Sequence, residues 1–292
     1  MELQNELDVM IESSSRPMLL PYMIDSVRKN MFYHGKMNWY INEDFVYPAE
    51  SKKVVKYCHS LEIFKKIYEN NPPIGIGQAI QNMLNNDIKS EFYLNLQDDW
   101  EQFIPINLSR VLWVMKRNPH INLIAFNKRI NPVSVSGYKY LEEEYDGLRM
   151  CLSYQVPLYS AIIRTEWMKK HWTINPDQHR TQESHFNRVL DAGLTKSHEH
   201  LREIGSYNYG AIGFPAVFSH SGYSWATKEV GEHPRRRSKN GELAYGGNVL
   251  HDLKPDSDVD YPPWLPPKPE RPMFLDNKQE DIKRLKAEGK IL

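Results

Sequence analysis

"FYLNLQDDW", residues 92–100, indicates the fold, because a strand-like apolar run ends there in two adjacent acids. FYLNLQ has the length and composition of a buried strand. Asp98 and Asp99 repel each other as carboxylates, so such a pair persists where both are solvated or where a cation holds them. We therefore expect the two aspartates at the end of a strand, lining a crevice at the edge of a sheet.

Segments on either side of this stretch alternate between strand-like and helix-like patterns. Before it, the patterns predict strands at residues 7–11 and 38–45 and helices at residues 18–27, 61–71 and 75–86. After it, we expect a helix at 103–119, a strand at 121–127, a strand running into a helix at 159–167, a helix at 182–193 closed by Gly193, and a short strand ending at His220. The alternation predicts an α/β fold with a mostly parallel sheet and helices on both faces.

The chain beyond residue 254 has a different composition. Seven prolines fall between Pro255 and Pro272, a density that neither a strand nor a helix tolerates. We expect a proline-rich C-terminal arm there, followed by a polar helical tail up to residue 292.

Composition restricts the classes of function. The chain has 292 residues, of which 40% are hydrophobic, and its 37 basic residues balance its 37 acidic ones. Global charge therefore gives no support for binding to nucleic acid or membranes, and only a local patch such as HPRRRSK, residues 233–239, could supply it. No secretory signal, long apolar run or cysteine framework is visible. We expect a cytoplasmic protein, in the host cytoplasm if the chain is viral.

Three motifs in this order resemble the nucleotide-sugar domain of the GT-A glycosyltransferases, close to glycosyltransferase family 2. They are LDVMIESSSRPMLL at residues 7–20, GIGQAIQNML at residues 75–84, and FYLNLQDDW. The resemblance covers about residues 7–118 and implies a GT-A, Rossmann-like fold. It divides the chain into a donor-binding half at 1–125, an acceptor-binding half of the same domain at 126–254, and the arm and tail at 255–292.

The resemblance also implies an activity. It points to an inverting, metal-assisted hexosyl- or pentosyltransferase, with a nucleotide sugar as donor, a UDP-sugar being the first choice, and Mn²⁺ or Mg²⁺ as cofactor. The acceptor is a glycan, a lipid carrier at a membrane face, or a hydroxymethylated DNA base as in phage-type enzymes. The oligomeric state is not readable.

Residue roles follow from the same resemblance. Asp99 is the metal ligand and a catalytic residue, and Asp98 lies beside the ribose or orients the site, against a pair of acids that simply caps the following helix. Gln97 stands where the family often has the first acid of its D-x-D motif. A late histidine often joins the metal, so His220 is a candidate ligand, against an ordinary histidine. Glu183 corresponds to the general base, against an acid that merely favours the helix N-terminus.

The remaining candidates are donor contacts, most of them with a structural alternative. Glu12, Ser13, Ser14 and Arg16 match the first loop of the family, against plain helix capping. Glu43 and Asp44 match the acid that reads the base, against a solvated loop. Gln78 and Asn82 share one helix face toward the donor. Arg236, in the basic run, would clamp the diphosphate or contact an acidic acceptor, against a solvated loop.

Two other classes of protein stay open. Gln97 favours a non-catalytic nucleotide-sugar-binding module on the same fold. A Rossmann-type oxidoreductase is the weaker rival, because GIGQAIQ does not complete G-x-G-x-x-G and follows two prolines rather than a strand.

Overall fold

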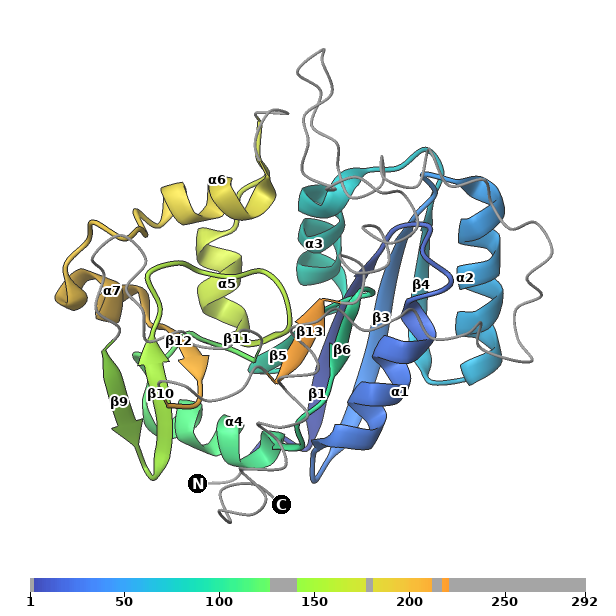
Figure 1. The fold of residues 1–292 in the computed structure, drawn as a ribbon. Helices are drawn as coiled ribbons and strands as arrows, with labels where there is room; N and C mark the ends of the chain where they lie inside the picture. Colours follow the sequence, from blue (N-terminus) through green and yellow to red (C-terminus); the bar gives the residue numbers. More distant parts are fainter. Residues whose placement is uncertain (1–2, 127–140, 177–180, 212–216, 221–292) are drawn as a thin grey trace.

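The protein is described by a computed structural model, which covers residues 3–126, 141–176, 181–211 and 217–220. Nine strands form one sheet in the order β4-β3-β1-β5-β11-β8-β12-β10-β9 (Figure 1). Their bounds are β1 Glu6–Ser13, β3 Lys36–Asp44, β4 Phe64–Asn70, β5 Phe92–Gln97, β8 Leu123–Ala125, β9 Glu142–Tyr145, β10 Leu148–Leu152, β11 Ala161–Arg164 and β12 Ser206–Tyr209. β11 and β10 run antiparallel to their neighbours, and the other strands share one direction.

Helices cover both faces of this sheet. In the view of Figure 1, α3 and α5 lie above the central strands, α4 lies below them, and α1 runs alongside β1 and β3. The helices are α1 Leu20–Asn30, α2 Pro48–Leu61, α3 Gly75–Asn86, α4 Leu108–Arg117, α5 Thr165–His171, α6 Gln182–Val189 and α7 His198–Ile204. Two small sheets pair β2 Met31–Phe32 with β7 Ile106–Asn107, and β6 Trp100–Gln102 with β13 Phe218–His220. The predicted α/β fold with a mostly parallel sheet is confirmed.

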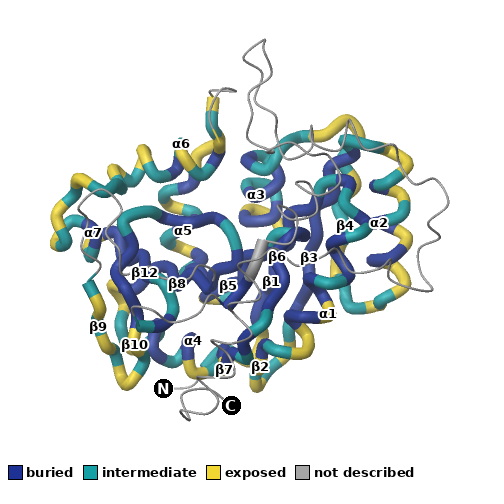
Figure 2. Tube along the Cα trace, in the orientation of Figure 1, coloured by how far each residue is buried: buried dark blue, intermediate teal, exposed yellow. Residues whose placement is uncertain are grey.

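The core lies around the central strands, which Figure 2 shows as the most deeply buried part of the chain. Every residue of β1 after Glu6 is buried. A central parallel strand is covered on both faces, so it favours apolar residues on both, and Leu7, Val9, Met10 and Ile11 supply them. The exception within this run is Asp8, whose buried carboxylate accepts hydrogen bonds from the backbone N–H groups of Lys89 and Ser90.

The helix predicted at 61–71 is wrong. Residues Phe64–Asn70 form β4, an edge strand parallel to β3, and the helix of this unit is α2, which lies earlier. Phe64 and Ile67 can pack at helical spacing or on a half-exposed edge strand, so periodicity alone misled the prediction. Glu62 ends α2 in a left-handed conformation, with φ 53°.

The bounds of two other helices differ from the predicted ones. The helix predicted at 103–119 starts only at Leu108, because the side chain of Asn107 accepts a hydrogen bond from the backbone N–H of Arg110 and caps it there. The helix predicted at 182–193 ends at Val189. Asp191, with φ 54°, takes the left-handed conformation after that helix, so Gly193 is not its cap. The hairpin of β9 and β10 was not predicted.

The topology of the sheet indicates where to look for a ligand site. The chain runs from β1 outward to β3 and β4, then returns to β5 on the other side of β1. Open α/β sheets bind ligands beyond the carboxyl ends of their strands at such a reversal. The ends of β1 and β5 are therefore the position at which to look for a site. Among the described residues, no helix is long and apolar enough to cross a membrane.

Candidate functional site

Asp98 and Asp99 follow β5 directly, at the point where the strand order reverses. The carboxyl ends of β1 and β5 are aligned, with Glu12 opposite Gln97, and the backbone N–H of Asp98 donates to the carbonyl of Glu12 over 3.2 Å. The loop after β1 thus lies beside the two aspartates. Both acids therefore lie at the edge where these strands end, and that they line a crevice stays a prediction. The alternative that they cap a helix is wrong, because the residues after them form the strand β6.

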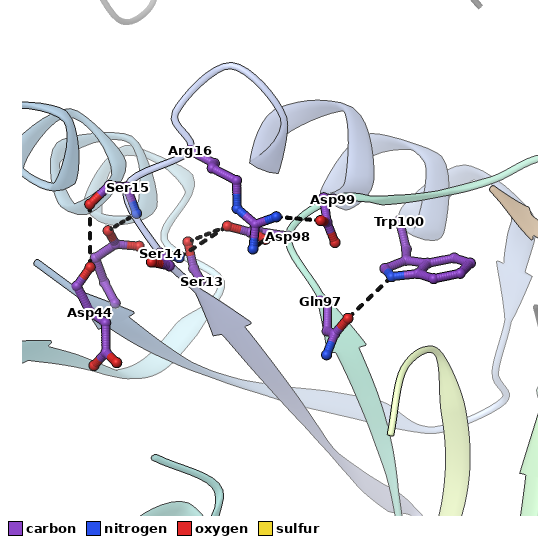
Figure 3. Close-up of polar contacts among 10 residues, drawn as sticks. Ser13, Ser14, Ser15, Arg16, Asp44, Gln97, Asp98, Asp99 and Trp100 are labelled. Atoms are coloured by element: carbon purple, nitrogen blue, oxygen red, sulfur yellow. Dashed lines mark hydrogen bonds and ion pairs between the residues drawn. The ribbon is translucent and has the colours of Figure 1, made fainter. Parts of the chain in front are cut away.

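Arg16 is the cationic group that holds the two acids together. It comes from the loop after β1, and its guanidinium reaches both carboxylates (Figure 3). One terminal nitrogen lies 2.8 Å from Asp98 Oδ1, and the other donates a hydrogen bond to Asp99 Oδ2. Asp98 has no exposed side-chain area and Asp99 very little, so this ion pair is shielded from water.

Asp98 is the more firmly held of the two acids. Its Oδ2 accepts hydrogen bonds from the hydroxyl of Ser13 over 3.0 Å and from the backbone N–H of Ser14 over 3.1 Å. Burial raises the pKa of Asp98 to about 6, although Arg16 lowers it. The serines therefore orient Asp98 and do not cap a helix. α1 begins after Leu19 with no side-chain cap, so the capping alternative for this loop is wrong.

Asp98 supports a prediction on stability. Asp98→Ala should lower the free energy of unfolding by about 3–5 kcal/mol, because it leaves the buried guanidinium of Arg16 with one carboxylate and two donors without an acceptor. Urea unfolding followed by circular dichroism measures this. A loss of less than about 1 kcal/mol would show that water or relaxation replaces the contacts.

Glu43 and Asp44 are adjacent in β3 and point to opposite faces of the sheet, as successive strand residues do. Glu43 Oε1 accepts from the hydroxyl of Ser51 in α2 over 2.6 Å and from the backbone N–H of Ser15 over 2.7 Å. Ser15 has φ 53°, and its hydroxyl also lies 2.8 Å from that of Ser51. Glu43 therefore ties the first loop to α2, and both serines were missed in the sequence.

Asp44 makes its hydrogen bonds on the opposite face of the sheet, at the start of α3. Its Oδ2 accepts from the backbone N–H of Gly75, the first residue of α3, over 2.7 Å, and its Oδ1 accepts from the amide of Asn70 over 3.1 Å. A carboxylate at a helix N-terminus satisfies donors that have no partner within the helix. Gly75 has φ 79°, which requires glycine. The solvated-loop alternative is wrong for both acids, since both are buried; their base-reading role stays a prediction.

Glu43 supports a prediction on pH dependence. Burial raises the pKa of Glu43 to about 7 from an ordinary value of 4.5. The folded state therefore keeps a proton that the unfolded state releases in this window, so stability falls as pH rises from about 4.5 to about 7, by at most about 3 kcal/mol. Glu43→Gln should reduce this loss, because the amide keeps the oxygen acceptor and does not titrate. Urea unfolding of wild type and Glu43→Gln at pH 5 and pH 8 measures the loss of stability between the two pH values. An equal loss in both proteins would contradict the prediction.

Glu12 lies deeper than a nucleotide contact requires. It is buried, and among the described residues no hydrogen bond of good geometry reaches its carboxylate oxygens. Burial raises the pKa of Glu12 well above its usual range, although the side-chain amide of Asn95 lies near enough to oppose this rise. Its side chain shares the α3 face of the sheet with Asn42 and Gln97, its register partners. Glu12 is thus a buried carboxyl near the carboxyl ends of β1 and β5.

Gln97 is engaged by an aromatic pair. Its Oε1 accepts from the indole N–H of Trp100 over 3.2 Å, and Trp100 stacks on Tyr159 with ring centroids 4.8 Å apart. This bond occupies the amide oxygen of Gln97, but a carboxylate could accept it as well, so it does not explain the departure from D-x-D. The sequence offered no signal for the contribution of Tyr159, which comes from a distant segment.

Gln78 and Asn82 share one face of α3, as predicted. The amide of Gln78 donates to Asn82 Oδ1 over 2.8 Å. The first turn of the same helix contacts α6. A Cβ built on Gly77 would lie 2.5 Å from Gln182 Oε1. Gly77 is therefore a close-approach glycine, which gives the GIG motif a packing role.

Glu183 lies in the first turn of α6 and is partly buried. Thr181 caps this helix by accepting from the backbone N–H of Ser184. Gln182 is buried, and its amide donates to the carbonyl of Thr173 over 2.7 Å and accepts from the N–H of Asn175 over 2.9 Å. A carboxylate could not make both bonds, which explains glutamine at this position. The contact between Gln182 and Gly77 places the start of α6, where Glu183 lies, beside the first turn of α3.

His220 and Arg236 differ in how far the structure describes them. The backbone of His220 in β13 pairs with that of Trp100, the neighbour of Asp99. Its side chain lies outside the described part, as does Arg236 with the whole basic run. The proline-rich arm and the tail also lie outside it.

A divalent cation fits the two carboxylates if phosphates complete its coordination. Within the described ranges, no three His, Cys, Asp or Glu side chains are grouped so that they could hold a metal ion alone. Mg²⁺ is usually bound by one or two carboxylates together with substrate phosphates. Asp99, with Asp98 beside it, therefore suits a hard cation shared with a diphosphate rather than a site built from protein alone.

Comparison with known proteins gives resemblances of fold only. Neither a protein-family model nor a curated protein sequence matches this chain. Solved glycosyltransferase structures resemble it, including residues 1–349 of S. aureus TarS, with a TM-score of 0.48, 13% identity, and coverage of 75% of this chain and 61% of that one. The chain thus spans about three fifths of that structure.

Two further structures contain manganese. The Pyrobaculum calidifontis mannosyltransferase PcManGT, in complex with GDP-Man and Mn²⁺, has a TM-score of 0.46 and 10% identity, with coverage of 85% of this chain and 70% of that one. GalNAc-T7 with UDP, GalNAc and Mn²⁺ has a TM-score of 0.41 and 14% identity, with coverage of 56% of this chain and 36% of that one.

Proposed function

We propose that this chain is an inverting glycosyltransferase that moves a sugar from a nucleotide-sugar donor, with a UDP-sugar as first choice, to an acceptor hydroxyl. One observation carries the proposal: a buried Asp98–Asp99 pair with Arg16 lies at the carboxyl ends of β1 and β5, where the strand order reverses. This is the position at which open α/β sheets bind ligands. The acids suit a cation, and the cation suits a diphosphate.

The chemistry assigns separate roles to the two halves of the site. The acceptor oxygen bonds to the anomeric carbon as the bond from that carbon to the phosphate oxygen breaks, and the acceptor proton passes to Glu183. A divalent cation held by Asp99 would neutralise the charge that develops on the leaving diphosphate. The loop of Ser13, Ser14 and Arg16 would hold the nucleotide. Residues 1–125 then form the donor half and residues 126–254 the acceptor half.

The test is a titration of the purified protein with a panel of UDP- and GDP-sugars in the presence of Mn²⁺, followed by a donor-hydrolysis assay. We expect one donor to bind and to be hydrolysed slowly without an acceptor. Binding without any turnover, with glycans or hydroxymethylated DNA added as acceptors, would favour the non-catalytic module instead. Failure of every nucleotide sugar to bind would contradict both functions.

A further inference from the structure

The guanidinium of Arg16 lies where a cation would be expected between the two aspartates. It is in contact with Asp98 Oδ1 and with Asp99 Oδ2, and its side chain is only 19% exposed. The pair therefore has a countercharge that belongs to the chain itself. Such a contact can be a purely structural ion pair. This one, however, lies at the carboxyl ends of β1 and β5, where open α/β sheets bind ligands.

We propose that Arg16 is the resident counter-cation of the aspartates, and that Arg16 and a divalent cation exclude each other at Asp99. The cation then binds strongly only together with the diphosphate of the donor, which gives Arg16 a new partner. This inference rests on the proposed function and adds an order of binding to it.

Exclusion follows from the arrangement of acceptors. A cation coordinated by Asp99 would share its carboxylate with the positive guanidinium, in a setting that water screens little. Asp98 cannot take over as the ligand at low cost, because Ser13 and Ser14 already donate to its Oδ2. Its Oδ1 lies against Arg16. Arg16 must therefore move away from Asp99 before the cation can bind.

A diphosphate would compensate Arg16 for this move. Arginine pairs bidentately with phosphate oxygens as well as with carboxylates. The Nε–H group of Arg16 is buried and, within the part of the chain that the structure describes, has no hydrogen-bond acceptor. One donor of the guanidinium thus stays available for an oxygen ligand. Because linkage is reciprocal, the nucleotide should raise the affinity for the cation as much as the cation raises that for the nucleotide.

The first arm of the test measures Mn²⁺ binding alone, by electron paramagnetic resonance of the free ion, without nucleotide and without activity. Wild type should bind Mn²⁺ weakly, and Arg16→Gln should bind it about tenfold or more tightly, because the competing cation is gone. Arg28→Gln is the matched control. It removes the same charge from an exposed position in α1 and should leave Mn²⁺ binding unchanged.

The second arm adds UDP. In wild type, UDP should lower the dissociation constant of Mn²⁺ by about tenfold or more, and in Arg16→Gln by clearly less. If Arg16→Gln does not fold, Arg16→Lys takes its place. Lysine keeps the charge but lacks the planar fork that spans both carboxylates, so Mn²⁺ alone should bind this variant more tightly than wild type.

Equal Mn²⁺ affinity of wild type and the folded variant, without nucleotide, overturns the inference. Equal enhancement by UDP in both proteins also overturns it. The first arm measures Mn²⁺ binding without a donor. If the chain binds no nucleotide sugar, the proposed function is refuted, but the Mn²⁺ affinities still decide whether Arg16 and the cation exclude each other at Asp99. Conversely, a hydrolysed donor with equal Mn²⁺ binding would leave the function standing and remove the role of Arg16.

Discussion

Asp99→Ala is expected to lower sugar transfer by roughly 10³-fold or more, because it removes the carboxylate that would hold the cation against the leaving diphosphate, a loss of several kcal/mol in the transition state. The fold should persist. Asp99 contacts Arg16, and in the variant Arg16 keeps Asp98 as its partner. Initial rates at saturating donor and Mn²⁺, with circular dichroism on the same samples, measure both effects.

Asp25→Ala is the matched control for this variant. It removes one carboxylate from an exposed position in α1 of the same chain, and it should keep the rate of wild type. Turnover of Asp99→Ala within about threefold of wild type would remove Asp99 from the catalytic role. A variant that loses its fold along with its activity would instead show that both aspartates are needed as partners of Arg16.

The central part of the fold was predictable from sequence because its signals are local. β1 and β5 are mostly apolar, with Asp8 and Asn95 as buried exceptions, and each ends in polar residues at the same sheet edge. β4 was not predictable from sequence, because its apolar residues are compatible with a helix and with a strand. Only its pairing with β3 decides between the two. The hairpin of β9 and β10 did carry a signal. Asp146 and Gly147 have φ 52° and 79°, the conformation that Asp-Gly turns favour.

The candidate site was predictable as a set of residues but not as a set of contacts. The order of motifs placed Asp98 and Asp99 at a strand end, and the structure has them there. The sequence could not show that Arg16 lies between them, since the ion pair to Asp99 joins residues that are 83 positions apart. The same holds for Ser51, whose bond to Glu43 depends on where α2 packs.

Of the two departures from the family pattern, the hydrogen bonds explain the one at Gln182 and not the one at Gln97. Gln97 and Gln182 both stand where acids were expected. Gln182 needs one donor and one acceptor on the same side chain, for the carbonyl of Thr173 and the N–H of Asn175. Gln97 needs only an acceptor for Trp100, so an acid there could accept this bond too. These substitutions concern neighbours of the proposed catalytic residues, and they leave Asp99 and Glu183 as carboxylates.

Glu183→Gln is expected to lower turnover by roughly 10²–10⁴-fold with little change in donor affinity, because an amide keeps the shape of the side chain and cannot take the acceptor proton. Glu183 lies in the first turn of α6, where an acid also stabilises the helix N-terminus. The two roles differ in what they change: loss of a base lowers the rate at saturation, whereas loss of a helix-favouring charge lowers stability by less than about 1 kcal/mol.

Glu166→Gln separates these roles, since Glu166 is likewise the acid in the first turn of its helix, α5. Both variants should lose similar, small amounts of stability, and only Glu183→Gln should lose turnover. Calorimetric titration with the donor, urea unfolding and rates at saturating donor give the three readouts. If Glu183→Gln instead loses donor binding and keeps its rate at saturation, Glu183 is a donor contact and the proton is taken up by another group.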